Sequence, residues 1–174
     1  SNSCIDSETI TVNVTDPISS NLGNEIICDG DDVTLNINTS GGSGVYTYLW
    51  DPPISTTSSS NVSPSANTTY NVTISDGCST PVMTQGTVTV NPTPIADFQA
   101  DCYPDEFKLQ FYDSSTIESP GEITQWEWNF GDPSSGLYNT SMTKNTSHVF
   151  TQHGMYTINL TVTSNLGCTA TISQ

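Results

Sequence analysis

The residues of this chain with the most evident chemistry are its five cysteines, because three of them introduce the same short motif. In each copy a cysteine is followed by a strand in which Thr alternates with apolar residues, and in two copies a proline then closes the strand. The spacing of the copies, roughly 75 to 90 residues, is the length of one small β-sandwich. The sequence therefore predicts part of a tandem array. The copies are Cys4 with 9–14 and Pro17, Cys78 with 87–91 and Pro92, and Cys168 with 169–172.

This repeat divides the chain into parts that we expect to fold separately. Residues 1–16 would be the last strand of a preceding repeat, 17–93 one Ig-like sandwich and 94–174 a second. The strand at 10–14 would pair with that preceding repeat or, alternatively, with a neighbouring subunit. Two prolines within 91–94 interrupt any central strand and stiffen the connection, so we expect an elongated array of β-sandwich modules.

Strand signals fill the sequence, and no apolar pattern of helical period persists for three turns. The fold class is therefore all-β. Trp126, Trp128 and Phe130 stand at alternate positions and share one face of a strand, which a sandwich buries. A sugar-stacking platform is the alternative for these rings. The expected core also contains Trp50 and Tyr156, and its other inward positions are Val33, Leu35, Ile37, Tyr46, Tyr48, Tyr70, Val72, Ile74, Val88, Val90, Phe107, Leu109, Phe111, Ile158, Leu160 and Val162.

The charge balance excludes two classes of partner. The net charge is −16, and Lys108 and Lys144 are the only basic residues besides two histidines. Such a chain repels nucleic acid phosphates and anionic lipid surfaces. No apolar run approaches the length of a membrane span. We therefore expect no nucleic acid partner and no membrane insertion.

Motifs in the second repeat resemble the PKD (polycystic kidney disease) domain, a seven-strand Ig-like sandwich. They are Trp128-Asn129-Phe130-Gly131-Asp132, then His148-Val149-Phe150, then Gly154-Met155-Tyr156-Thr157-Ile158-Asn159-Leu160. The resemblance covers about 94–174, and the first repeat looks like a related Ig-like module without the Phe-Gly-Asp element. Tandem modules of this kind resemble those of large secreted proteins and gliding-type surface adhesins of Bacteroidota. The resemblance implies a structural role for His148 and turn-capping roles for Asp113 and Asp132.

The positions of the cysteines around the two modules predict one disulfide in each module. Cys28 precedes the first long strand and Cys78 follows the Tyr70 strand, while Cys102 and Cys168 occupy the corresponding places in the second module. Each bond would close a loop worth about 4 kcal/mol by chain-entropy arguments. Metal ligation is the alternative, but no Cys-x-x-Cys spacing occurs. Cys4 stays unpaired within the segment, with its partner in a preceding module or as a free thiol.

Calcium is the metal that the acidic residues favour, because a hard cation binds several oxygen ligands converging from a loop. The candidate ligands are Asp29, Asp31 and Asp32, beside Cys28. Turn capping and solvation are the alternative for these side chains. A second acidic group comprises Asp97, Asp101, Asp105 and Glu106.

The sequence offers few residues of the types that catalyse reactions. His148 and His153 are the only histidines, and neither a Gly-x-Ser-x-Gly nor a His-Glu-x-x-His motif is present. We therefore expect a non-catalytic extracellular segment of a repeat-containing surface protein, acting as stalk, adhesin or filament component in an oxidising compartment. Its partners would be neighbouring repeats of the same chain, with other subunits or surface glycans as further candidates. The alternative is an accessory PKD-like module of a secreted hydrolase that binds glycans.

Overall fold

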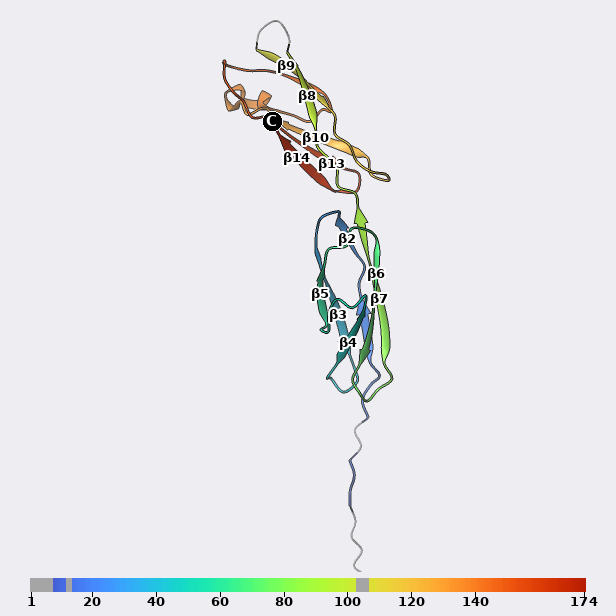
Figure 1. Cartoon of the computed structure of the whole chain (residues 1–174). Coiled ribbons are helices and arrows are strands. Elements are labelled where there is room, and N and C mark those ends of the chain that lie inside the picture. Colours follow the sequence, from blue (N-terminus) through green and yellow to red (C-terminus); the bar gives the residue numbers. More distant parts are fainter. Residues whose placement is uncertain (1–7, 12–13, 103–106) are drawn as a thin grey trace, which may run out of the picture. The chain divides into compact units, whose positions relative to one another are not determined.

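The computed structural model describes residues 8–11, 14–102 and 107–174, and almost all of its regular structure is β-strand (Figure 1). One short 3-10 segment, η1, interrupts the strands. The elements are β1 Ser19–Leu22, β2 Glu25–Cys28, β3 Val33–Ser40, β4 Thr47–Asp51, β5 Ser59–Val62, β6 Thr68–Ser75, β7 Val82–Asn91, β8 Phe98–Cys102, β9 Lys108–Asp113, β10 Ile123–Asn129, η1 Pro133–Asn139, β11 Thr140–Ser141, β12 Thr146–Val149, β13 Asn159–Ser164 and β14 Thr169–Ser173.

The N-terminal half of the chain forms two sheets, with strand orders β1-β3-β5 and β2-β7-β6-β4. Strand β6 shows why this sequence folds so, because Tyr70, Val72 and Ile74 are buried while the residues between them are half-buried. The antiparallel register places Trp50 of β4 opposite Val72. The indole of Trp50 is 1% exposed, and its Nε1 donates a hydrogen bond to the Thr57 carbonyl at 2.9 Å. A large buried ring thus keeps its polar atom satisfied.

The C-terminal half also forms two sheets, with strand orders β12-β9-β8 and β11-β10-β13-β14. Strand β10 pairs antiparallel with β13, which sets Trp126 opposite Val162 and Trp128 opposite Leu160. Inward side chains from both sheets form one core. Its buried members are Phe98, Phe111, Trp128, Phe130, Phe150, Ile158, Leu160 and Val162, and Trp126 and Tyr156 pack against it while partly buried.

By their contacts the residues group into two compact units that are not continuous in sequence. The first holds residues up to Glu25 with Val33–Val62 and Thr68–Val88, and the second holds Ile26–Asp32, Ser63–Asn67 and Thr89–Gln174. The boundary expected between 93 and 94 therefore stays a prediction. In the described part of the chain, no helix is long and apolar enough to cross a membrane.

Besides Trp126 and Tyr156, six inward positions expected from the alternation are not buried in the structure. Tyr46, Tyr48 and Leu109 are half-buried. Phe107 is 46% exposed and has a positive φ of 49°, which turns its side chain out of the strand pattern. Val33 and Val90 are half-buried because they stand at strand ends. In the strand expected at 10–14, the described Ile10 and Val14 are exposed and lie in no strand, and its other residues are in part outside the described ones.

Candidate functional site

A disulfide between Cys28 and Cys168 joins positions that lie 140 residues apart in sequence. Cys28 is the last residue of β2, and Cys168 stands in the turn between β13 and β14. Their Cα atoms are 5.7 Å apart, and both residues belong to the second compact unit. The predicted pairs Cys28–Cys78 and Cys102–Cys168 are therefore wrong.

The geometry of β7 explains why Cys28 does not reach Cys78. The residue after Cys28, Asp29, donates its N–H to the carbonyl of Asn91 at the end of β7, whereas Cys78 precedes the start of this strand. Ten residues separate these ends along β7, and at ~3.4 Å per residue they lie about 30 Å apart. A disulfide needs Cα atoms within about 7 Å. Because Cys168 is bonded to Cys28, it is not available to Cys102.

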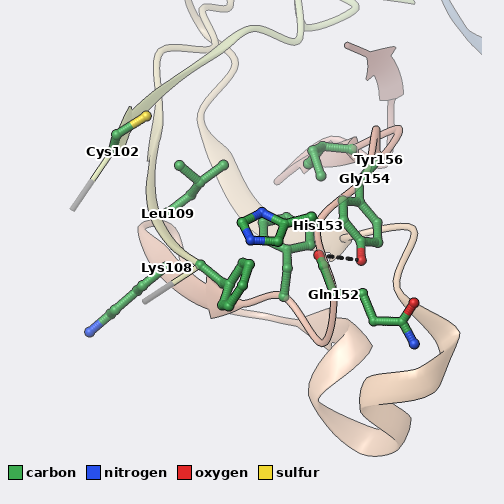
Figure 2. A pocket seen from close by; sticks show the side chains of 10 residues that line it. Cys102, Lys108, Leu109, Gln152, His153, Gly154 and Tyr156 are labelled. Carbon is green, nitrogen blue, oxygen red and sulfur yellow. Dashed lines mark hydrogen bonds between the residues drawn. The ribbon is translucent and has the colours of Figure 1, made fainter. Parts of the chain in front are cut away.

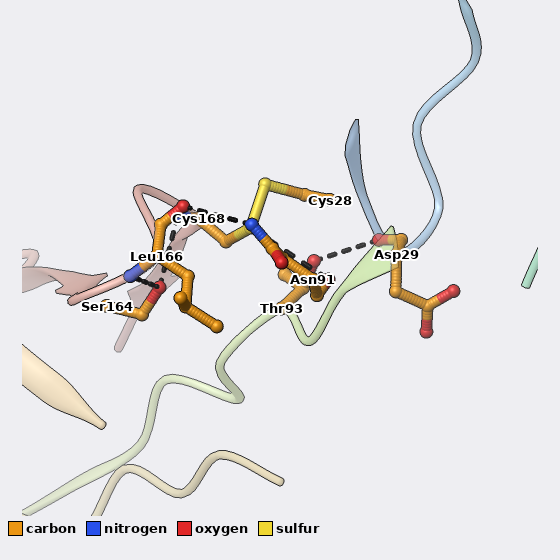
Figure 3. The surroundings of a disulfide bond; sticks show 7 residues. All are labelled: Cys28, Asp29, Asn91, Thr93, Ser164, Leu166 and Cys168. Atoms are coloured by element: carbon orange, nitrogen blue, oxygen red, sulfur yellow. Dashed lines mark hydrogen bonds between the residues drawn. A yellow bond between two sulfur atoms is a disulfide. The ribbon is translucent and has the colours of Figure 1, made fainter. Parts of the chain in front are cut away.

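Hydrogen bonds hold the two cysteines in fixed turns (Figure 3). Asn91 accepts the Asp29 N–H at 2.8 Å through its carbonyl and donates its Nδ2 to the Leu166 carbonyl at 3.3 Å. The Oγ of Ser164 accepts the N–H of Cys168 at 3.1 Å. Hydrogen bonds that do not involve sulfur, from backbone and side-chain groups, thus position the segments that carry both cysteines.

The other cysteines have separate positions. Cys78 and Cys102 are exposed and have no disulfide partner among the described residues. Cys4 lies outside the described residues, so its expected unpaired state stays a prediction.

The acidic side chains that the structure describes are not clustered as a calcium site requires. Among the described residues, no group of three or more His, Cys, Asp or Glu side chains is placed to hold a metal ion. Asp29, Asp31 and Asp32 are exposed in the turn after β2. Asp105 and Glu106, of the second acidic group, lie outside the described residues.

A buried carboxylate, Asp132, is the most polar feature of the C-terminal core. It is 1% exposed and accepts hydrogen bonds from the N–H of Thr151 at 2.9 Å and from its hydroxyl at 2.8 Å. Its Oδ2 lies 3.3 Å from Nε2 of His148, whose ring stacks on Phe130 with ring centroids 4.4 Å apart. Through Thr151, Asp132 thus joins the turn after β10 to the segment after β12. Asp132 was expected to cap a turn, and in the structure its buried carboxylate links two segments instead. The Phe-Gly-Asp and His-x-Phe motifs were the sequence signal for it.

This arrangement sets both the ionisation of Asp132 and the access of solvent to its side chain. Burial raises the pKa of Asp132, but the hydrogen bonds from Thr151 and His148 outweigh burial and hold the pKa below its usual value. The side chains of His148 and Asp132 are each 2% exposed, so a substrate has no access to the pair. The Thr151 hydroxyl donates a hydrogen bond to the Asp132 carboxylate within the same buried contact.

The lowered pKa predicts an acid sensitivity of the C-terminal unit. A carboxylate with a depressed folded pKa contributes stability that is present above its unfolded pKa of about 3.9 and is lost as pH falls through the folded pKa. We expect Asp132→Asn to lower the guanidinium midpoint at pH 7 and to weaken the pH dependence of that midpoint between about pH 5 and 2. Glu127→Gln, at an exposed position of β10, is the control. An Asp132→Asn profile parallel to that of the parent chain would contradict this assignment.

A surface hollow of about 400 Å³ lies between the end of β8 with β9 and the segment 150–158 (Figure 2). The ring of Phe107 contacts that of His153 with centroids 4.2 Å apart, and the hydroxyl of Tyr156 donates to the Gln152 carbonyl at 2.9 Å. Cys102 lines the same hollow. Apolar and aromatic side chains line much of this hollow, together with the Cys102 thiol and the His153 imidazole.

The aromatic strand β10 is a core strand and not a sugar-stacking platform. Trp128 and Phe130 are 0% and 1% exposed. Trp126 is half-buried at the margin, with Nζ of Lys144 at 5.6 Å from its ring centroid. Lys144 also lies 4.0 Å from the Asp113 carboxylate, which accepts the Ser115 N–H as a turn cap. The exposed Lys144 side chain thus lies over the edge of the core, near Trp126 and Asp113.

Comparison with known proteins agrees with this geometry. Residues 91–174 match the family model of the PKD domain. The resemblance inferred from the motifs of the second repeat is confirmed for this part of the chain by the match. PKD domains are non-catalytic modules.

Relatives extend the comparison. Collagenase ColA of Bacillus cereus is 35% identical over 60 residues, which are 34% of this chain and 6% of the collagenase. The PKD1 domain of Vibrio anguillarum Epp is 29% identical, with 48% of this chain and 90% of that chain covered and a TM-score of 0.41. The eight N-terminal Ig domains of Down Syndrome Cell Adhesion Molecule (DSCAM) give a TM-score of 0.55 at 13% identity, with 89% and 23% covered. The last likeness shows an Ig-like fold alone. The chain spans only a small part of the collagenase.

Proposed function

We propose that this chain is a non-catalytic stalk segment of a longer secreted or surface protein, built to bear tension. The observation that carries the proposal is the Cys28–Cys168 bond. When the two ends of the chain are pulled, the force passes through this covalent bond. The segment between the bonded cysteines, which lie 140 residues apart in sequence, is therefore not extended. The closed site of Asp132 and His148, the PKD domain and the disulfide, which is typical of oxidising compartments, support the same proposal.

Single-molecule pulling from the two termini tests the proposal. We expect the oxidised chain to unfold without releasing the segment between the bonded cysteines. After reduction, this segment should add about 480 Å of contour length, since an extended chain gains roughly 3.4 Å per residue. The Cys78→Ser variant, which leaves the bond intact, is the matched control. Release of the whole chain length from the oxidised protein would contradict a load-bearing role.

A second candidate is an accessory module of a secreted hydrolase. The likeness to the Bacillus cereus collagenase, at 35% identity, favours it. The two candidates differ in what adjoins this segment in the full-length protein. A protease or glycosidase domain beside it favours the accessory module, and many similar repeats favour the stalk.

A further inference from the structure

The cysteines of the described residues occupy two recurring positions. An early cysteine is the last residue of the strand that precedes the first long strand of its repeat. Cys28 ends β2 in this way, and Cys102, 74 residues later, ends β8. A late cysteine stands in the last hairpin turn of its repeat. In the first repeat this is Cys78, between β6 and β7, and in the second it is Cys168, between β13 and β14.

The two late turns are also alike in detail. The glycine before each cysteine has a positive φ, 74° for Gly77 and 85° for Gly167. In each turn a side chain accepts the cysteine N–H, Asp76 at 3.0 Å and Ser164 at 3.1 Å. The N–H groups of Ser79, Cys78 and Ser43 hold the pKa of Asp76 well below its usual range. Cys78 therefore has the same turn geometry as Cys168, although Cys78 is exposed and has no disulfide partner among the described residues.

The structure shows which early cysteine bonds to which late one. Cys28, early in the first repeat, is bonded to Cys168, late in the second. Under the same rule Cys78 and Cys102, the two other cysteines among the described residues, have no partner within these two repeats. Cys102 needs a late cysteine of a following repeat, and Cys78 needs an early cysteine of a preceding one.

We propose that the Cys28–Cys168 bond is one link in a series, in which the early cysteine of every repeat is bonded to the late cysteine of the next. The proposal rests on the tandem arrangement proposed above. Cys78 and Cys102 are then the two attachment points of this segment, one toward each side of the series. Their occupant is a cysteine of a like repeat, and a metal or a small thiol is not required.

Each link forms by oxidation of two thiols. A thiolate attacks a disulfide oxidant and forms a mixed disulfide, and the second thiol displaces the oxidant's remaining thiol. The two cysteines lose two electrons and two protons, and the oxidant becomes two thiols. The exposure of Cys78 and Cys102 gives an oxidant access to both.

A series of this kind has a mechanical consequence. Cys102 lies inside the loop that Cys28 and Cys168 close, so its bond to a later repeat would close an overlapping loop. Each stretch of backbone between successive links is then bridged by a neighbouring link. An array so bonded resists extension along its whole length, which a series of separate loops with one in each repeat would not do.

The test extends the full chain by a third repeat in the same register. Gln174 stands six residues after Cys168, as Thr84 stands six after Cys78, so residues 85–174 are added a second time after Gln174. The added copy carries Cys102→Ser and Thr169→Ser, and the original carries Cys4→Ser. The first change removes the competing thiol, and the second marks the added Cys168 peptide by mass. The extended protein is folded with reduced and oxidised glutathione, and its disulfides are mapped by non-reducing digestion and mass spectrometry.

We expect the original Cys102 to be linked to the added Cys168, with the Cys28–Cys168 bond unchanged. The Cys78→Ser version of the extended protein, altered at the other attachment point, should form the same new link. A free or glutathione-capped original Cys102 beside an intact Cys28–Cys168 bond would overturn the series. That result would leave the stalk proposal standing, because pulling tests the existing bond alone.

A second measurement does not depend on the added repeat. In a Cys4→Ser background, the Cys102→Ser and Cys78→Ser chains are oxidised at high concentration, separately and mixed. A series predicts dimers in the mixture, through Cys78 of one chain and Cys102 of the other. Symmetric dimers of either variant alone, in preference to the mixed dimer, would contradict the pairing rule.

Discussion

Replacement of Trp128 by alanine should lower the free energy of unfolding of the C-terminal unit by roughly 3 to 5 kcal/mol, as truncation of a buried large ring does. The side chain is fully buried and contacts Phe98, Phe111 and Phe130, with ring centroids 5.2, 5.6 and 6.5 Å away. Its Nε1 donates to the Thr143 carbonyl at 2.9 Å. The substitution therefore opens a cavity among three rings and leaves the Thr143 carbonyl without its donor.

Guanidinium unfolding followed by hydrogen exchange of the β10 and β13 amides measures this effect within the C-terminal unit. Glu127→Ala, one residue away on the exposed face of β10, is the control and should change stability by less than about 0.5 kcal/mol. A Trp128→Ala chain with parent stability and altered glycan binding would make β10 a ligand face instead.

The strands and the core were largely predictable from the sequence because both depend on local alternation. Tyr70, Val72 and Ile74, or Ile158, Leu160 and Val162, stand at every second position, and a sandwich buries such a row on one side. The alternation fails where the backbone leaves the strand conformation. Phe107 is such a residue, since it stands in a turn just before β9 with a positive φ.

The cysteine pairing was not predictable in the same way, because it depends on which end of a sheet each residue reaches. Sequence places Cys28 before one long strand and Cys78 after another, which suggests a pair in one module. The β2–β7 pairing instead carries Cys28 to the Asn91 end of β7, away from Cys78. Burial of Asp132 has the same origin, since its partners Thr151 and His148 approach only through the fold.

Loss of the Cys28–Cys168 bond should produce the second large effect. By chain-entropy arguments, a cross-link that spans 140 residues restricts the unfolded chain by about 5 kcal/mol, the upper end of what disulfides contribute. We expect Cys28→Ser to lower the stability of the C-terminal unit by about 2 to 5 kcal/mol, in a Cys4→Ser, Cys78→Ser, Cys102→Ser background that prevents new pairs. Cys28 is the better residue to change, since Cys168 is fully buried and its thiol behaves there as a small apolar group.

Hydrogen exchange of β13 and β14 amides across guanidinium concentrations measures this loss, and the background chain with its bond intact is the reference. Because the hydrogen bonds of Asn91 to Asp29 and Leu166 do not involve sulfur, the folded structure should persist in the variant. The effect should therefore vanish when both chains are compared under reducing conditions. A Cys28→Ser chain as stable as the oxidised reference would mean that the bond adds no constraint to the unfolded state, and the load path through it would then lose its physical basis.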